Sequence, residues 1–118
     1  MSGSRTPIDG RKEGLVAALR AWFERRKEEF AREGMELEYF DSKSKYSGCA
    51  YTDFTTPSLM ARSTVWNAEA WRGGFCDFEL LDFETGAMLL YEHHEEIDAP
   101  TLLRLLDAFV EKMKALER

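Results

Sequence analysis

The chain has 118 residues, a formal net charge of −6 and a sequence pI near 5.0. This length fits one domain whose core needs no disulfide or metal to hold it together. The acidic charge disfavours nucleic acids and anionic membranes, which bind through cationic side chains, and it favours a basic protein partner.

Two features of the sequence predict a cytoplasmic protein. Cys49 and Cys76 are too few for a disulfide framework and indicate a reducing compartment. The first residues lack the apolar run of a signal peptide, and no stretch approaches the roughly 20 apolar residues that span a bilayer. We expect residues 1–10 to be a mobile segment and residues 11–118 to form a single α+β domain.

A helix is predicted over residues 11–33. Leu15, Leu19, Trp22 and Phe30 recur at helical spacing and form an apolar stripe, with charged residues on the opposite side. Gly34 stands where a left-handed residue would end the helix.

After Gly34 the hydrophobic period changes from 3.6 to 2, which indicates strands. Five strands are predicted, over residues 35–39, 46–55, 59–66, 75–82 and 87–94. A final helix follows, capped by Asp98, with Pro100 in its first turn. The order α-β-β-β-β-β-α predicts a five-stranded antiparallel meander whose two helices pack on one face.

The register of the last hairpin decides which of its side chains face the helices. Residues 83–86 are expected to form its turn, with Gly86 at a positive φ and Asp82 paired with Ala87. An unbroken ladder from that pair places Cys76 opposite His93. One face then carries Cys76, Phe78, Leu80, Leu89, Tyr91 and His93, which we expect toward the helices. The other carries Phe75, Asp77, Glu79, Leu81, Met88, Leu90, Glu92 and His94, which we expect to be open.

The motifs that could support catalysis or metal binding are weak. Adjacent residues of a strand point to opposite faces, so His93 and His94 cannot hold one metal ion together. A Cys76–His93 pair resembles a nucleophile and its base, but no motif supplies an oxyanion hole, and packing explains the pair better. We therefore expect no catalytic residue, no cofactor and no metal.

The open face of the sheet is the candidate binding surface. It mixes carboxylates placed opposite each other, which cost stability in an isolated protein, with exposed apolar side chains. Tryptophan is enriched at the energetic centres of interfaces, and two tryptophans flank this face. The expected partner-binding residues are Trp66, Trp71, Asp77, Glu79, Glu84, Leu90, Glu92 and His94.

Four short segments carry a family resemblance: ARSTVW at 61–66, GFCDFELLD at 74–82, ETG at 84–86 and YEHH at 91–94. Together with the leucine-rich C-terminal helix, they resemble the TriTu immunity proteins of bacterial polymorphic-toxin systems. The resemblance covers about residues 59–110. It implies a small cytoplasmic antitoxin that binds a cognate toxin domain stoichiometrically and blocks it without catalysis. The sequence leaves open whether the free protein is a monomer or a homodimer. Such toxins are often basic, which suits an acidic inhibitor.

Two other classes fit the composition. A type III secretion chaperone is also small and acidic, and would bind an extended effector segment, usually as a dimer. An enzyme would need the Cys76–His93 pair to be open to solvent.

Overall fold

The computed structural model describes residues 14–41, 48–67 and 74–117. The expectations for residues 1–10 and for Trp71 lie outside these ranges. The elements in chain order are α2 (Gly14–Arg32), β1 (Glu36–Asp41), β2 (Gly48–Thr55), β3 (Leu59–Asn67), β4 (Gly74–Asp82), β5 (Met88–Ile97) and α3 (Ala99–Leu116).

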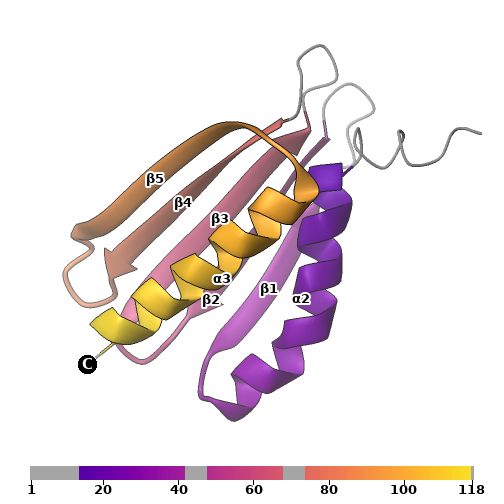
Figure 1. The fold of residues 1–118 in the computed structure, drawn as a ribbon. Helices are drawn as coiled ribbons and strands as arrows, with labels where there is room; N and C mark the ends of the chain where they lie inside the picture. The colour runs from indigo at the N-terminus through magenta and orange to yellow at the C-terminus, as the bar shows by residue number, and fades with distance from the viewer. Residues whose placement is uncertain (1–13, 42–47, 68–73, 118) are drawn as a thin grey trace, which may run out of the picture.

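The five strands form one antiparallel sheet in the order β1-β2-β3-β4-β5, and both helices lie on the same face of it (Figure 1). The predicted α+β meander is therefore confirmed. The predicted strands differ mainly at one end, because β5 continues three residues beyond His94 to Ile97.

The end of α2 depends on a left-handed glycine. Gly34 has a φ of 85°, and the Met35 N–H donates to the Phe30 carbonyl at 2.9 Å. This bond, from the second residue beyond the helix back to its last turn, satisfies a carbonyl that would otherwise lack a partner. The chain then enters β1 at a fixed angle, with Leu37 and Tyr39 toward the helices and the alternating glutamates away from them.

Trp22 is the centre of the core. It is 1% exposed and its ring lies 5.8 Å from Phe30 of the same helix and 6.0 Å from Phe54 of β2. Its indole Nε1–H donates to Asp107 Oδ1 of α3 at 3.0 Å. One side chain thus joins both helices to the sheet, and its polar atom keeps a partner on burial.

The second helix begins where the sequence predicts. The Asp98 side chain accepts a hydrogen bond from the Thr101 N–H at 3.0 Å, and Pro100 occupies the first turn. The buried stripe of α3 packs over the middle of the sheet; it consists of Leu102, Leu106, Phe109, Val110 and Met113. The ring of Phe109 stacks on Phe78 of β4 at 4.9 Å.

The predicted register of β4 and β5 is correct at the turn and wrong beyond it. The Asp82 backbone N–H donates to the Ala87 carbonyl at 2.9 Å, and Gly86 has a φ of 77°, as expected. A one-residue bulge then leaves Leu89 unpaired, since Leu81 pairs with Met88 and Leu80 pairs with Leu90. Every later residue of β5 therefore faces the opposite way from the prediction. A second irregularity lies at Glu96, whose φ is 56°, because Phe75 pairs with Glu95 and Gly74 pairs with Ile97, the last residue of β5.

The buried hydroxyl of Thr52 allows a test of the core. Thr52 on β2 is 0% exposed, and its Oγ1 has no hydrogen-bond partner among the described residues. A buried unpaired hydroxyl costs about 1–3 kcal/mol. We expect Thr52→Val, which keeps the shape, to raise the free energy of unfolding by about 1 kcal/mol in urea titrations. Thr64→Val, on the half-buried opposite face, is the control and should change it by less than about 0.5 kcal/mol. Destabilisation by Thr52→Val would contradict the conclusion that the Thr52 hydroxyl is buried without a hydrogen-bond partner.

Candidate functional site: the open face of the sheet

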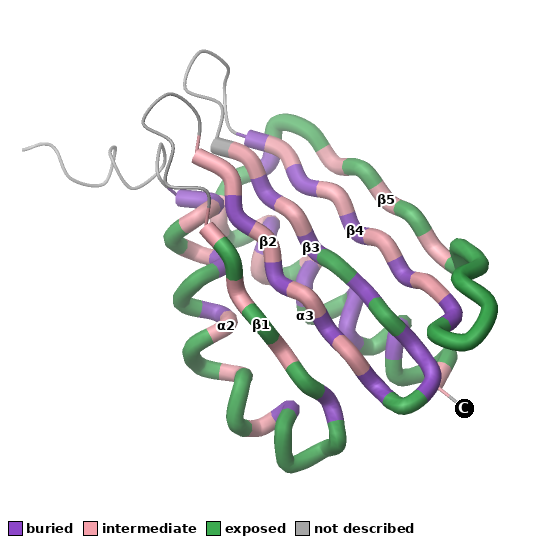
Figure 2. Tube along the Cα trace, turned by 180° about the vertical axis from the view of Figure 1, so that it is seen from behind, coloured by how far each residue is buried: buried purple, intermediate pink, exposed green. Residues whose placement is uncertain are grey.

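The sheet has one covered face and one open face. Figure 2 views the molecule from the side of the open face, with both helices behind the strands. Strand alternation and register place on this open face Glu36, Glu38 and Phe40 of β1, Cys49, Tyr51, Asp53 and Thr55 of β2, Met60, Arg62, Thr64 and Trp66 of β3, Phe75, Asp77, Glu79 and Leu81 of β4, and Met88, Tyr91, His93 and Glu95 of β5.

The open face is strongly acidic. It carries six carboxylates, and Arg62 is its only lysine or arginine within the described strands. Carboxylates neighbour each other across strands, as Glu38 does with Asp53. Carboxylates placed in this way repel each other, and their combined charge favours a cationic partner.

Arg62 is already held in place. Its Nε donates to Asp53 Oδ1 at 2.7 Å and its Nη2 donates to Oδ2 at 3.1 Å, and the guanidinium lies 4.0 Å from the centre of the Tyr51 ring. The bond to Asp53 is the main reason that the pKa of Arg62 is raised. A planar fork of this kind neutralises one of the six carboxylates, and the described strands offer the other five no further lysine or arginine on this face.

His93 lies between two carboxylates on the same face. Its Nδ1 contacts the Asp77 carboxylate and its Nε2 lies 2.9 Å from Glu95 Oε2. The hydrogen bond to Asp77, followed by the bond to Glu95, raises the pKa of His93. The Phe75 ring lies 5.9 Å away and forms one side of this group.

Trp66, which we expected to flank the open face, lies on that face within β3. It is half-buried and stacks on Phe75 of β4, with 4.9 Å between ring centres. Gly74 makes this approach possible, because a Cβ there would lie 2.2 Å from the Trp66 carbonyl oxygen. The indole therefore presents a flat apolar surface beside the acidic residues of β4.

The three predicted binding residues of β5 do not lie on the open face. The bulge at Leu89 turns Leu90, Glu92 and His94 toward the helices. Tyr91, His93 and Glu95 occupy the open face in their place. The sequence did not predict these three residues as part of the binding surface. Nothing in the identity of Leu89 marks it as a bulge residue, so the alternation pattern carried no signal for the change.

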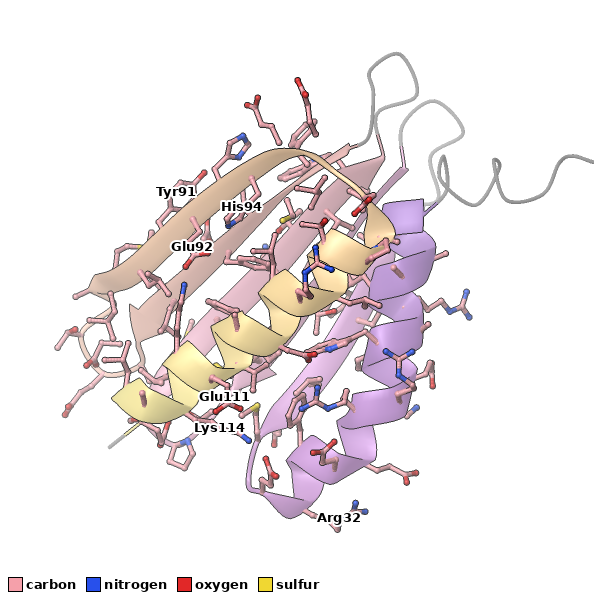
Figure 3. All side chains as sticks on the ribbon, in the orientation of Figure 1. Arg32, Tyr91, Glu92, His94, Glu111 and Lys114 are labelled. Atoms are coloured by element: carbon pink, nitrogen blue, oxygen red, sulfur yellow. The ribbon has the colours of Figure 1, made fainter. Side chains whose placement is uncertain are left out.

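Glu92 and His94 belong to a contact between β5 and α3 (Figure 3). Glu92 is ion-paired with Lys112 of α3, and its second oxygen lies 3.0 Å from His94 Nε2. Partial burial opposes ionisation, but the bonds to Lys112 and His94 outweigh it and lower the pKa of Glu92. These residues hold the sheet edge to the helix. Glu84 is exposed in the β4–β5 turn.

The Cys76–His93 pair is not formed. Cys76 is 0% exposed on the helix side, where its register partner is His94, while His93 lies on the open face. Burial, together with Asp77 and Glu92, raises the pKa of Cys76 to about 12. Its sulfur is therefore a protonated core atom rather than a nucleophile. The two histidines do lie on opposite faces, and the described residues contain no cluster of three His, Cys, Asp or Glu suited to a metal.

These observations define the class: an α+β protein with an acidic and aromatic open sheet face. Neither of the helices in the described part of the chain combines the length and apolar content needed to cross a membrane. The family model described as "Immunity protein TriTu" matches residues 17–112, so the chain belongs to the TriTu immunity protein family. Membership implies a toxin-neutralising immunity role. No curated protein and no solved structure matches the chain.

The position of His93 predicts a pH dependence of stability. Because its folded-state pKa is raised, its contribution is fully present below the unfolded value of about 6.5 and is lost as pH rises through the folded value. We expect His93→Gln to narrow the difference in melting temperature between about pH 6 and pH 8.5. NMR titration of the His93 ring should show the raised pKa directly. An equal difference in both proteins would contradict this contribution.

Proposed function

We propose that this protein neutralises a cognate toxin domain by binding it stoichiometrically in the cytoplasm, without catalysis, and that the open face is the contact surface. The observation that supports this proposal is the excess of carboxylates over cationic side chains on a face that neither of the two described helices covers. Within an immunity family, such a face suits a basic toxin surface.

The charges of the open face favour binding of a partner at the expense of stability of the free protein. Asp77 and Glu79 are on the same side of β4, and Glu36 and Glu38 are on the same side of β1. Repulsion among them costs stability in the free protein, and cations of a partner would remove that cost. Long-range attraction would also accelerate capture of the toxin, which matters for an inhibitor that must act before damage occurs.

The aromatic residues supply short-range energy. Trp66 stacked on Phe75, Tyr51 beside Arg62, and exposed Tyr91 give the open face large apolar surfaces with restricted motion. Buried aromatic side chains dominate the binding energy of most interfaces. We therefore assign the contact to Trp66, Asp77, Glu79, Tyr91 and His93. Leu90, Glu92 and His94 are not included, because they face the helices.

The first experiment is co-expression with the C-terminal domain of the protein encoded by the adjacent upstream gene, which we test as the toxin. We expect growth to be rescued and the two proteins to co-purify in a fixed ratio. Rescue without a complex would argue against stoichiometric binding. Toxicity that persists in the presence of the folded protein would reject that toxin as the partner.

Charge reversal tests the contact surface. Glu38→Lys combined with Asp77→Lys changes the charge of the open face by four units at exposed or half-buried positions. We expect the association rate with the toxin domain to fall at least about tenfold at low salt, with the difference shrinking as salt rises. Stopped-flow measurement of the intrinsic tryptophan fluorescence of the mixture would give this rate.

The matched control changes the same charge on the helix side. Glu28→Lys combined with Glu111→Lys alters exposed positions of α2 and α3. Its association rate should remain within about threefold of the original protein. Equal slowing in both variants would mean that net charge alone matters and would remove the open face from the proposal.

A further inference from the structure

The exposed apolar side chains are concentrated at one end of the sheet. Among the large hydrophobic residues that the structure describes as exposed, Met60, Phe83, Met88, Leu89 and Tyr91 lie at the start of β3, in the β4–β5 turn or early in β5. Met60 pairs with Leu81, which pairs with Met88, so these side chains form a row across three strands. Trp66 lies at the opposite end of this face, near the end of β3.

A hollow of about 350 Å³ lies within this apolar corner, on the open face. Its apolar walls are Met60, Leu81 and Phe83, and its charged lining comes from Asp53, Arg62 and Glu79. The hollow therefore combines a hydrocarbon surface with charged groups.

The charges of the hollow do not balance. Asp53 is matched by Arg62 through two hydrogen bonds. Glu79, the cross-strand neighbour of Arg62, forms no ion pair within the described chain, which leaves one negative charge in excess. One further cation would make this group of charges neutral.

The backbone that carries Phe83 is held in place by hydrogen bonds within this chain. The Phe83 N–H donates to the Ser58 carbonyl at 2.9 Å, which ties the β4–β5 turn to the β2–β3 turn. The Asp82 carboxylate accepts hydrogen bonds from the N–H groups of Glu84 and Thr85 at 2.9 and 3.1 Å. A preformed wall loses little entropy when a ligand binds against it.

We infer that this hollow is the anchoring socket of the open face and receives one protruding lysine or arginine side chain of the toxin. The hydrocarbon stem would lie along Met60, Leu81 and Phe83, and the cationic head would reach Glu79. Long basic side chains have this division between an apolar stem and a charged end. The inference rests on the proposed function for the identity of the partner, and it adds the residue type and the position of the anchor.

The first test needs no toxin. Butylguanidinium represents the end of an arginine side chain, and butylurea is its uncharged counterpart of similar shape. With methyl-labelled methionine, we expect butylguanidinium to shift the Met60 signal with a dissociation constant of about 20 mM. The buried Met113 signal should stay in place. Butylurea, or the variant Glu79→Gln, should weaken the effect at least about fivefold. No saturable shift of Met60, or an equal shift in Glu79→Gln, would overturn the socket.

The second test uses the toxin complex. An anchor acts mainly on dissociation, whereas distant charges act on association. We expect Phe83→Ala and Glu79→Gln each to raise the dissociation rate at least about tenfold, with association changed less than about threefold. Phe40→Ala is the matched control, because Phe40 is 41% exposed against 49% for Phe83 and lies on the opposite edge strand. It should leave dissociation nearly unchanged.

The outcomes separate the two proposals. If the complex forms and charge reversal weakens it, but Phe83→Ala behaves like Phe40→Ala, the socket is wrong and the open face remains. If the protein proves dimeric and Glu79→Gln separates the dimer, the cation comes from a second copy and the assignment to the toxin is overturned. If no variant of the open face affects the complex, the proposed contact surface itself fails.

Discussion

The packing of both helices on one face of the sheet is the constraint on which the rest of this structure depends. Trp22 takes part in this packing on two sides, because its buried indole contacts Phe54 of the sheet and donates a hydrogen bond to Asp107 of the second helix. The side chains on one side of the strands are used in that contact, and neither of the described helices covers the other side. An open face of a five-stranded sheet is stable in water only if its side chains tolerate solvent, and here charged residues meet that need.

The same charges exceed what solubility requires. Glu36, Glu38, Asp77 and Glu79 stand on one surface with Arg62 as the only described lysine or arginine among them, and Arg62 is already engaged by Asp53. A protein selected for stability alone gains by mixing signs on such a surface. An inhibitor that must find a basic partner quickly gains by keeping one sign, and the cost to stability is recovered when the partner binds. Family membership and surface charge therefore agree.

Rigidity at the edge of the sheet complements this attraction. The β4–β5 turn is fixed by the Asp82 side chain and by the bond from Phe83 to Ser58, and β5 is tied to α3 through Glu92 and Lys112. The exposed apolar residues of the corner thus project from a supported edge rather than from a loose loop. Attraction over distance and anchoring at contact are separate physical effects; the carboxylates are spread along the whole open face, whereas exposed apolar side chains gather at the corner near the β4–β5 turn.

Local rules were enough to determine the elements and their order. The stripe of Leu15, Leu19 and Trp22, the left-handed Gly34 and the Asp98 cap each act within a few residues, so the sequence alone predicts them. Alternation also predicted that Asp77 and Glu79 share the open face. The tertiary structure alone decided the orientation of β5, since the bulge at Leu89 depends on how the hairpin fits against the neighbouring sheet and helices. That one inserted residue moved Glu92 and His94 to the helix side and Tyr91 and His93 to the open face, because side chains of a strand alternate with a period of two.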